Sequence, residues 1–201
     1  MRRSEFEIND EALMLSCLDA CEFGVLSLLS EEEPYGVALN FAYVEGTLFF
    51  HGAKEGRKVD AIKAHSRASF LAVRPYAYIP SYFSQTTLAS PATQFFASVH
   101  FFGAIELIEE AEVKASALNA LMQKYQKEGK YDPVDTNNPA YKHVLEKTGV
   151  YKLTPTTWSM KLKVGQNLTH ERFAHFIEEL EKRNAAGDKE TIEMMRYISK
   201  Y

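Results

Sequence analysis

The sequence predicts a mainly β protein of the α+β class, in which a mostly antiparallel sheet closes into a barrel and helices flank it. Three short apolar stretches, residues 24–29, 35–43 and 47–51, follow one another with connections of only a few residues. Such connections are too short for the crossovers that parallel strands need. Closure into a barrel is expected, because it leaves no strand edge exposed. From Thr169 onward the pattern changes, and apolar residues recur at the spacing of a helix face.

The other elements follow from apolar periodicity, turn residues and capping residues. The expected strands are residues 24–29, 35–43, 47–51, 67–73, 93–108 (with a bulge near Gly103 as an alternative) and 150–161. The expected helices run from Asn9 or Asp10 to about Cys21, from Arg57 to Ala64, from Glu109 to about Gln126, from Pro139 (capped by Asn138) to Lys147, from Thr169, and again after Gly187. Residues 75–91 are expected to form a long aromatic loop. A loop of this length more often lines a functional site than simply connects two elements.

Length and composition bound the class of protein. The 201 residues suit one barrel domain, 1–165, with a helical extension, 166–201. A hydrophobic content of 46% and a charged content of 25% are ordinary for a soluble globular protein. The net charge of -4 gives no reason to expect nucleic acid as a partner.

Cysteine usage and the chain start indicate a cytoplasmic protein. Cys17 and Cys21 lie four residues apart on a predicted helix, so they indicate buried thiols and not a disulfide framework or a metal site. The first residues turn acidic before any apolar run, which argues against a secretory signal. No window approaches the roughly 20 apolar residues of a membrane span.

The most distinctive stretch runs from Phe49 to Ile62 and reads FFHGAKEGRKVDAI. It predicts the end of a strand, a tight loop with two glycines, and the first turn of a helix. Arg57 and Lys58 stand at the predicted helix start, and Lys54 lies in the loop. Cations are unfavourable beside the unpaired N–H groups of a helix N-terminus unless an anion binds there. The stretch therefore predicts a phosphate site, with a solvated turn as the alternative.

The sequence favours a mononucleotide over a dinucleotide as the phosphate ligand. No GxGxxG turn follows a strand, whereas one phosphate cradle suits FMN. A flat isoalloxazine ring needs backbone polar groups at one edge and apolar or aromatic walls. The stretches Asn40–Tyr43 and Tyr76–Phe83 can supply both. Trp158 has two interpretations, a cap on the ring or a core residue.

The histidines carry weaker signals. His51 and His100 lie on predicted strands, where each either donates a proton to a substrate or is simply hydrogen-bonded in place. His170 and His175 are five residues apart, so a helix would point them in different directions and a metal pair is not expected. His65 and His143 are expected at the surface.

The order of these elements resembles the FMN-binding split-barrel proteins related to pyridoxamine 5'-phosphate oxidase, with the nitroimidazole-resistance-like branch as the best fit. The stretches LNFAY, FFHGAKEGRKVDAIKAHSRASF, SVHFFGAIELIEE and LNALMQKYQ carry the resemblance, which spans roughly residues 8–163. It implies a six-stranded antiparallel split β-barrel with flanking helices and a C-terminal helical extension. It also implies a homodimer with FMN bound across the interface.

The resemblance also assigns residues around the phosphate of the cofactor. Arg57 and Lys58 fall where the family holds the FMN phosphate. Lys54 and His51 fall in the loop that lines the same cofactor.

A second group of residues is assigned to the flavin ring. Asn40, Phe41 and Tyr43 fall on the strand whose backbone runs along the isoalloxazine edge, and Ser98 falls on a strand that approaches the cofactor. Trp158 is included as a cap on the ring.

The sequence departs from the family pattern in three places. His100 occupies a position that is often small or aliphatic in the family. The helical tail after Lys163 extends beyond the minimal barrel, and the motif that binds pyridoxal phosphate in the true oxidases is not recognisable.

Three functions remain open at the level of sequence. The first is an FMN-dependent oxidoreductase that passes electrons from a reduced nicotinamide donor to a small planar acceptor, for example a nitroaromatic. The second is a haem-binding or haem-degrading split barrel with His170 or His175 as the iron ligand. The third is a non-catalytic flavin-binding module whose tail meets a partner.

Overall fold

The computed structural model describes residues 2–199, which fall into two compact units. One unit, called the tail unit, comprises residues 2–11, 73–98 and 159–199. The other, called the loop unit, comprises residues 12–72 and 99–158 and contains the basic loop. The prediction of a barrel domain at 1–165 with an extension at 166–201 stays a prediction.

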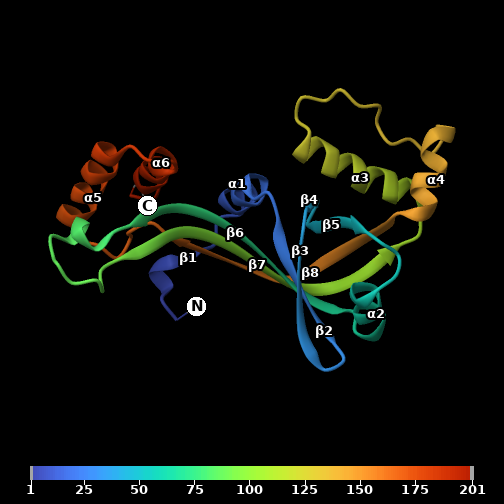
Figure 1. The fold of residues 1–201 in the computed structure, drawn as a ribbon, viewed down its shortest axis with the longest axis horizontal. Helices are drawn as coiled ribbons and strands as arrows, with labels where there is room; N and C mark the ends of the chain where they lie inside the picture. Colours follow the sequence, from blue (N-terminus) through green and yellow to red (C-terminus); the bar gives the residue numbers. More distant parts are fainter. Residues whose placement is uncertain (1, 200–201) are drawn as a thin grey trace. The chain divides into compact units, whose positions relative to one another are not determined.

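The strands form one eight-stranded sheet in which β3, β2, β6, β7, β8, β5 and β4 are neighbours in that order, and β1 also pairs with β8 (Figure 1). The strands are β1 (Glu7–Ile8), β2 (Gly24–Ser30), β3 (Glu33–Leu39), β4 (Ala42–Val44), β5 (Thr47–Gly52), β6 (Arg67–Ile79), β7 (Thr93–Ile108) and β8 (Gly149–Lys163). The pairs β1–β8, β2–β3, β2–β6, β4–β5 and β5–β8 are all antiparallel. The predicted fold class is confirmed, with eight strands in place of six.

The helices flank this sheet at the positions that the caps predict. They are α1 (Glu11–Ala20), α2 (Arg57–Ala64), α3 (Ala111–Tyr125), α4 (Pro139–Lys147), α5 (His170–Arg183) and α6 (Asp188–Ile198), with 3-10 turns η1 (Ser4–Phe6) and η2 (Ser81–Ser84). The Asn138 side chain accepts a hydrogen bond from the N–H of Ala140, and the Thr169 side chain accepts one from Arg172. Within residues 2–199, no helix is both long and apolar enough to cross a membrane.

The core of the loop unit follows the alternation of its strands. Leu26 of β2 pairs in register with Phe70 of β6, and both are fully buried. Phe50 of β5 pairs with Tyr151 of β8, and their rings stack 5.4 Å apart. Phe41 meets Phe70 edge to face at 4.9 Å. Aromatic pairs therefore link the paired strands in this interior.

Two sequence predictions about strands are wrong. The strand expected at residues 35–43 is broken, because Asn40 and Phe41 lie between β3 and β4. The loop expected at residues 75–91 is shorter, because β6 continues through Pro75 to Ile79. The extra length of β6 has a partner that local sequence does not reveal, since the N–H of Ala77 donates to the hydroxyl of Thr191 at 2.8 Å. The strand β1 was also not predicted.

Gly103 allows the close approach of two backbones. A Cβ at this position would lie 2.1 Å from the carbonyl oxygen of Thr154 and 2.8 Å from the Cα of Pro155. The Gly103→Ala variant is therefore expected to lower the free energy of unfolding by about 1–3 kcal/mol, because backbone must move. Denaturant unfolding measures it against Gly36→Ala, whose Cβ would meet Val25 at an ordinary 3.4 Å. Equal stability of the two variants would contradict this account.

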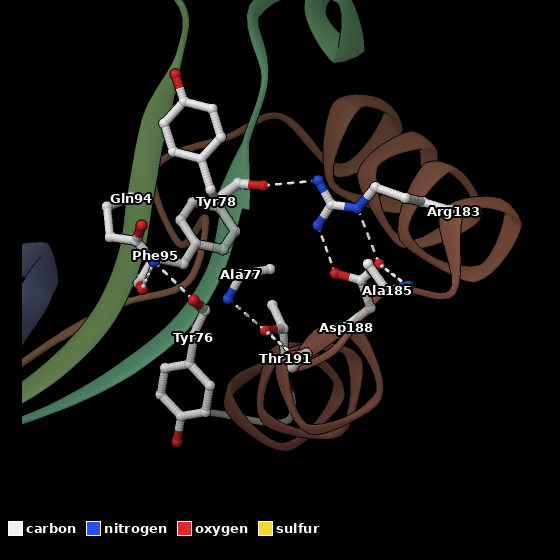
Figure 2. A network of polar contacts seen from close by, with 10 residues as sticks. Tyr76, Ala77, Tyr78, Gln94, Phe95, Arg183, Ala185, Asp188 and Thr191 are labelled. Carbon is white, nitrogen blue, oxygen red and sulfur yellow. Dashed lines mark hydrogen bonds and ion pairs between the residues drawn. The ribbon is translucent and has the colours of Figure 1, made fainter.

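The helical tail docks on its own chain within the tail unit. Figure 2 shows Arg183, at the end of α5, donating through Nη1 to the carbonyl of Tyr78 at 2.8 Å and pairing with Asp188, at the start of α6. Thr191 of α6 binds the backbone of Ala77. Tyr78 and Ala77 belong to β6. The tail therefore supplies hydrogen-bond partners for backbone groups of that strand.

Candidate functional site

The helix α2 begins at Arg57, as predicted, and its start defines the candidate site in the loop unit. Gly56 precedes it with a φ of 96°, a conformation that residues with a Cβ rarely adopt. The carbonyl of Gly56 accepts from the N–H groups of Val59 and Asp60. The first N–H groups of the helix have no carbonyl of an earlier turn to bind. We call Arg57, Lys58 and this first turn the basic corner.

Arg57 is held in place by the hairpin of β2 and β3. Its Nε donates to the hydroxyl of the buried Ser30 at 3.0 Å, and its guanidinium lies 4.5 Å from the centre of the Tyr35 ring. The side chain is nevertheless exposed. A fixed guanidinium with its outer nitrogens toward water is suited to bind an oxyanion.

Lys58 turns toward β5 and β8. Its ammonium lies 4.9 Å from the centre of the Tyr151 ring and 5.8 Å from that of Phe50. It occupies the space beside Gly52, where an added Cβ would lie 2.3 Å from Nζ. Burial lowers the pKa of Lys58. Among residues 2–199 no ion pair or hydrogen bond to this ammonium is found, so a half-buried cation faces aromatic rings alone.

His51 lies next to this cation on β5. Burial lowers the pKa of His51, and the charge of Lys58 lowers it further. Both effects favour the neutral form of the imidazole. An anion bound beside Lys58 and His51 would favour the charged forms of both side chains and so raise both pKa values.

The residues predicted to contact the edge of the flavin ring do not line the basic corner but lie in other parts of the loop unit. Asn40 is exposed, and its side chain donates to the carbonyl of Glu22 at 2.8 Å. Phe41 is fully buried, and the Tyr125 hydroxyl binds both its N–H (3.0 Å) and its carbonyl (3.1 Å). The backbone of Phe41 is thus already satisfied by α3.

Tyr43 lines a cleft of about 360 Å³. Its ring stacks on that of Phe101 with the centres 5.3 Å apart. Lys124 of α3 lies on the same cleft, donates to the carbonyl of Leu18 at 2.9 Å, and sits 3.5 Å from the centre of the Phe41 ring. Burial lowers the pKa of Lys124 to about 8, against the opposing effects of Cys21 and Asp19.

Lys54 faces a different cleft, of about 420 Å³, together with residues of α3 and α4. The carbonyl of Ala53, the residue before it, accepts a hydrogen bond from the Tyr151 hydroxyl at 2.6 Å. The loop is thus anchored directly before Lys54. Neither Arg57 nor Lys58 lines the 420 Å³ cleft.

The remaining predicted residues lie on long strands. Ser98 is half-buried on β7 in the tail unit. His100 and Phe102 follow on β7 in the loop unit with their rings 4.3 Å apart, and burial lowers the pKa of His100. Trp158 of β8 is 37% exposed, so it is not a core residue. Its assignment to the cofactor stays a prediction. The same holds for the other assigned residues: Asn40, Phe41, Tyr43, His51, Lys54, Arg57, Lys58 and Ser98.

The other histidines lie where the sequence places them. His65 and His143 are exposed, as expected. His170 is exposed at the start of α5, and His175 is half-buried beside the ring of Phe176. No histidine lines the 360 Å³ cleft or the 420 Å³ cleft.

Sequence reasoning missed several residues that shape these sites. Ser30, Tyr35 and Tyr151 come from other strands, and nothing local marks them as partners of the basic corner. Lys114 did carry a signal, because it lies three and seven residues before Ala117 and Leu121 on the buried face of α3. A lysine on an apolar helix stripe points to a partner inside the protein.

Comparisons with known proteins agree with this fold. Residues 10–162 match the family model described as pyridoxamine 5'-phosphate oxidase. No match was found among the curated proteins. Structures that share the fold include the following three. A candidate 5-nitroimidazole antibiotic resistance protein from Bacteroides thetaiotaomicron has a TM-score of 0.63 at 22% identity, over 77% of this chain and 85% of that chain.

The flavocytochrome Anf3 from Azotobacter vinelandii has a TM-score of 0.65 at 21% identity, over 84% of this chain and 75% of that chain. A FAD and haem binding protein from Mycobacterium smegmatis has a TM-score of 0.64 at 18% identity, over 84% of this chain and 78% of that chain. At these identities the likeness concerns the fold, and it supports the predicted split-barrel class.

Proposed function

The chain belongs to the pyridoxamine 5'-phosphate oxidase family, a flavin-binding family, and from this premise we propose that it is an FMN-dependent oxidoreductase acting on a small planar acceptor. The flavin would supply the redox chemistry, taking electrons from a reduced nicotinamide donor and passing them on from its ring. The side chains of this chain would bind the phosphate, orient the ring and exclude water.

The basic corner is the observation that carries the proposal. Lys58 is a half-buried cation without a counter-ion among residues 2–199, and Arg57, the residue before it, is held by a hydrogen bond to Ser30. A phosphate dianion would accept from both side chains and from the first N–H groups of α2. Such a group would remove the conflict between two cations and the positive end of a helix.

The corner also favours FMN over FAD. Its two cations and one helix start match a single terminal phosphate, and a terminal phosphate is what FMN carries. FAD has a pyrophosphate in its interior and no terminal phosphate. The relatives named above include proteins described as binding FAD, so the choice between the two flavins is decided by the released cofactor.

We propose further that a second copy of the chain completes the ring site. Val25 of β2 and Leu71 of β6 are paired in register, and both are exposed. Phe102 of β7 is 48% exposed and Trp158 is 37% exposed. Apolar side chains on the outer faces of these strands are suited to an interface between protomers. A homodimer with the flavin across its interface follows as the simplest arrangement.

The nitroaromatic acceptor is proposed from the name of one relative, the candidate 5-nitroimidazole antibiotic resistance protein. Haem binding is the second candidate, since two relatives are described as a flavocytochrome and a FAD and haem binding protein. The basic corner favours flavin, because a phosphate-binding group has no role in ligating iron. A non-catalytic flavin-binding module would have the same basic corner, and it would differ from the oxidoreductase only in that its bound flavin is not reduced and reoxidised by substrates.

The visible spectrum of the purified protein tests the function. We expect a yellow protein that releases FMN on denaturation, is bleached by a reduced nicotinamide, and regains its colour when a nitroaromatic is added. Chromatography of the released cofactor separates FMN from FAD. A Soret band would instead support haem, and bound flavin that no donor reduces would support the non-catalytic module. A colourless protein that does not bind added FMN at micromolar concentration would overturn the proposal.

A further inference from the structure

We propose that the cleft lined by Lys54, Lys114 and Lys142, called the lysine cleft, binds the terminal phosphate of a small molecule other than the flavin. The cleft has a volume of about 420 Å³ and also contains Leu145, Glu109 and Glu146. Each lysine comes from a different element: the loop before α2, α3 and α4. The site lies within the loop unit and does not include the basic corner.

Lys114 is the buried member of the cluster. It is 3% exposed, and its ammonium donates to the carbonyl of Leu145 at 2.6 Å. Leu145 lies in the last turn of α4, where the negative end of the helix favours a cation. A neutral carbonyl satisfies one of the three N–H groups of the ammonium, and a buried charge of this kind normally has an anionic partner.

Lys54 brings a second cation to the first. Burial is the main cause that lowers the pKa of Lys114, and the nearby charge of Lys54 lowers it further. Glu109 acts in the opposite direction. Two amines that meet in a cleft repel each other when both are charged, and an anion placed between them would favour the charged form of both.

The carboxylates on the cleft do not balance its positive charge. With every group ionised, the three lysines outnumber Glu109 and Glu146 by one. Within residues 2–199, no ion pair joins any of these lysines to either glutamate. The cationic groups are therefore available to a ligand.

A phosphate monoester fits the cluster better than a carboxylate does. A terminal phosphate presents three oxygens and up to two negative charges, which matches three amines from three elements. A carboxylate presents two oxygens and one charge. The volume of the cleft leaves room for a small organic group beside the phosphate.

The side chains of Lys54 and Lys58 have different surroundings, so this site is separate from the basic corner. The hydrogen bond from Tyr151 to the carbonyl of Ala53 anchors the loop directly before Lys54. Lys58 follows Lys54 on the same side of that anchor, but it lies against the rings of Tyr151 and Phe50 and does not line the cleft. One short loop thus contributes a cation to each of two anion sites.

Calorimetric titration with inorganic phosphate tests the inference. The Arg57→Ala/Lys58→Ala variant is the cleanest background, because the two cations of its basic corner are removed and only the weak site at the helix start is left. In this background we expect phosphate to bind. Adding Lys54→Ala and Lys142→Ala should weaken that binding about tenfold or more, since two charge-assisted contacts are lost. Lys147→Ala, which removes an exposed cation of α4 outside the cleft, is the matched control and should change nothing. Both lysines of the double variant are at least partly exposed, so folding should be retained.

A second readout follows the buried amine itself. In the same background, the pKa of Lys114, read from the NMR shift of its Cε, should rise when phosphate is added and not when chloride is added at equal ionic strength. Phosphate binding that is unaffected by the loss of Lys54 and Lys142, or a Lys114 pKa that phosphate does not move, would overturn the inference. Failure of the flavin proposal is read separately, from the colour of the wild-type protein.

Discussion

Replacing Arg57 and Lys58 together by alanine is expected to weaken FMN binding by at least about 100-fold. Each side chain would give the phosphate a charge-assisted hydrogen bond worth about 1.5–3 kcal/mol, and about 3 kcal/mol corresponds to a hundredfold change. The helix start remains in the variant, so its N–H groups keep a weak phosphate site. Fluorescence titration of the apoprotein with FMN measures the change.

Lys63→Ala is the matched control for this prediction. Lys63 is an exposed lysine in the last turn of the same helix, so its removal changes the net charge of the protein without touching the basic corner. We expect the control to retain FMN as the wild type does. If the double variant binds FMN normally, or if Lys63→Ala weakens binding to the same extent, the phosphate does not sit at the basic corner.

The basic corner was predictable because its signal is local. The glycines, the helix start and the two cations lie within a few residues, and helix-end electrostatics applies to any such stretch. The directions of the side chains were not predictable. Lys58 lies against Tyr151, which is more than ninety positions away, and Arg57 binds Ser30 of another hairpin. Such pairings depend on the register of the sheet.

The sheet shows the same division between local and distant causes. A short apolar run located β2, a hairpin-type turn located β5, and alternation of apolar residues located β3 between them. Alternation predicted more than the structure has. It failed at Asn40 and Phe41, where the pattern continues but the strand does not, since the Tyr125 hydroxyl takes the place of a neighbouring strand for Phe41. A hydroxyl on a helix that begins about seventy residues later in the chain leaves no trace in the local pattern.

The tail shows most clearly how a local pattern can miss a buried polar contact. Its helices were predicted from their caps and apolar stripes, but the GDKE stretch around Asp188 has the composition of a solvated turn. Asp188 is only 1% exposed. Its carboxylate accepts from Arg183 Nε at 2.9 Å, from the Nη2 of the same guanidinium, and from the N–H of Ala185 at 2.8 Å. Arg183 then reaches the carbonyl of Tyr78 on β6. The polar pair is thus what joins the turn between α5 and α6 to the strand (Figure 2).

Replacing Asp188 by asparagine is expected to lower the free energy of unfolding of the tail unit by about 3–5 kcal/mol. The substitution keeps the size of the side chain and leaves the guanidinium of Arg183 without its counter-ion, and removing one partner of a buried pair has costs of this order. Hydrogen exchange of the α5 and α6 amides measures the loss locally. Glu179→Gln, which breaks the exposed pair of Glu179 with Lys182, is the control and should leave hydrogen exchange in α5 and α6 nearly unchanged.

The same pair predicts how the tail responds to acid. Burial alone would raise the pKa of Asp188, but the hydrogen bonds from Arg183 and Ala185 and the charge of Arg183 outweigh burial and hold it below its ordinary value. The folded pKa therefore lies below the unfolded pKa of about 3.9. The stabilisation is fully present above the unfolded pKa and is lost as the pH falls through the folded pKa. The wild-type tail should open below about pH 4, and Asp188→Asn should remove that part of the pH dependence.

Replacing both Arg183 and Asp188 by apolar residues distinguishes the cost of an unpaired charge from the cost of lost hydrogen bonds. The Arg183→Met/Asp188→Leu variant removes both charges and should recover part of the stability that Asp188→Asn loses, because no unpaired charge is left inside the protein. If the double variant is as unstable as Asp188→Asn, the cost comes from the lost hydrogen bonds to Tyr78 and Ala185. If Asp188→Asn alone leaves hydrogen exchange in α5 and α6 unchanged, the pair does not hold the tail to β6.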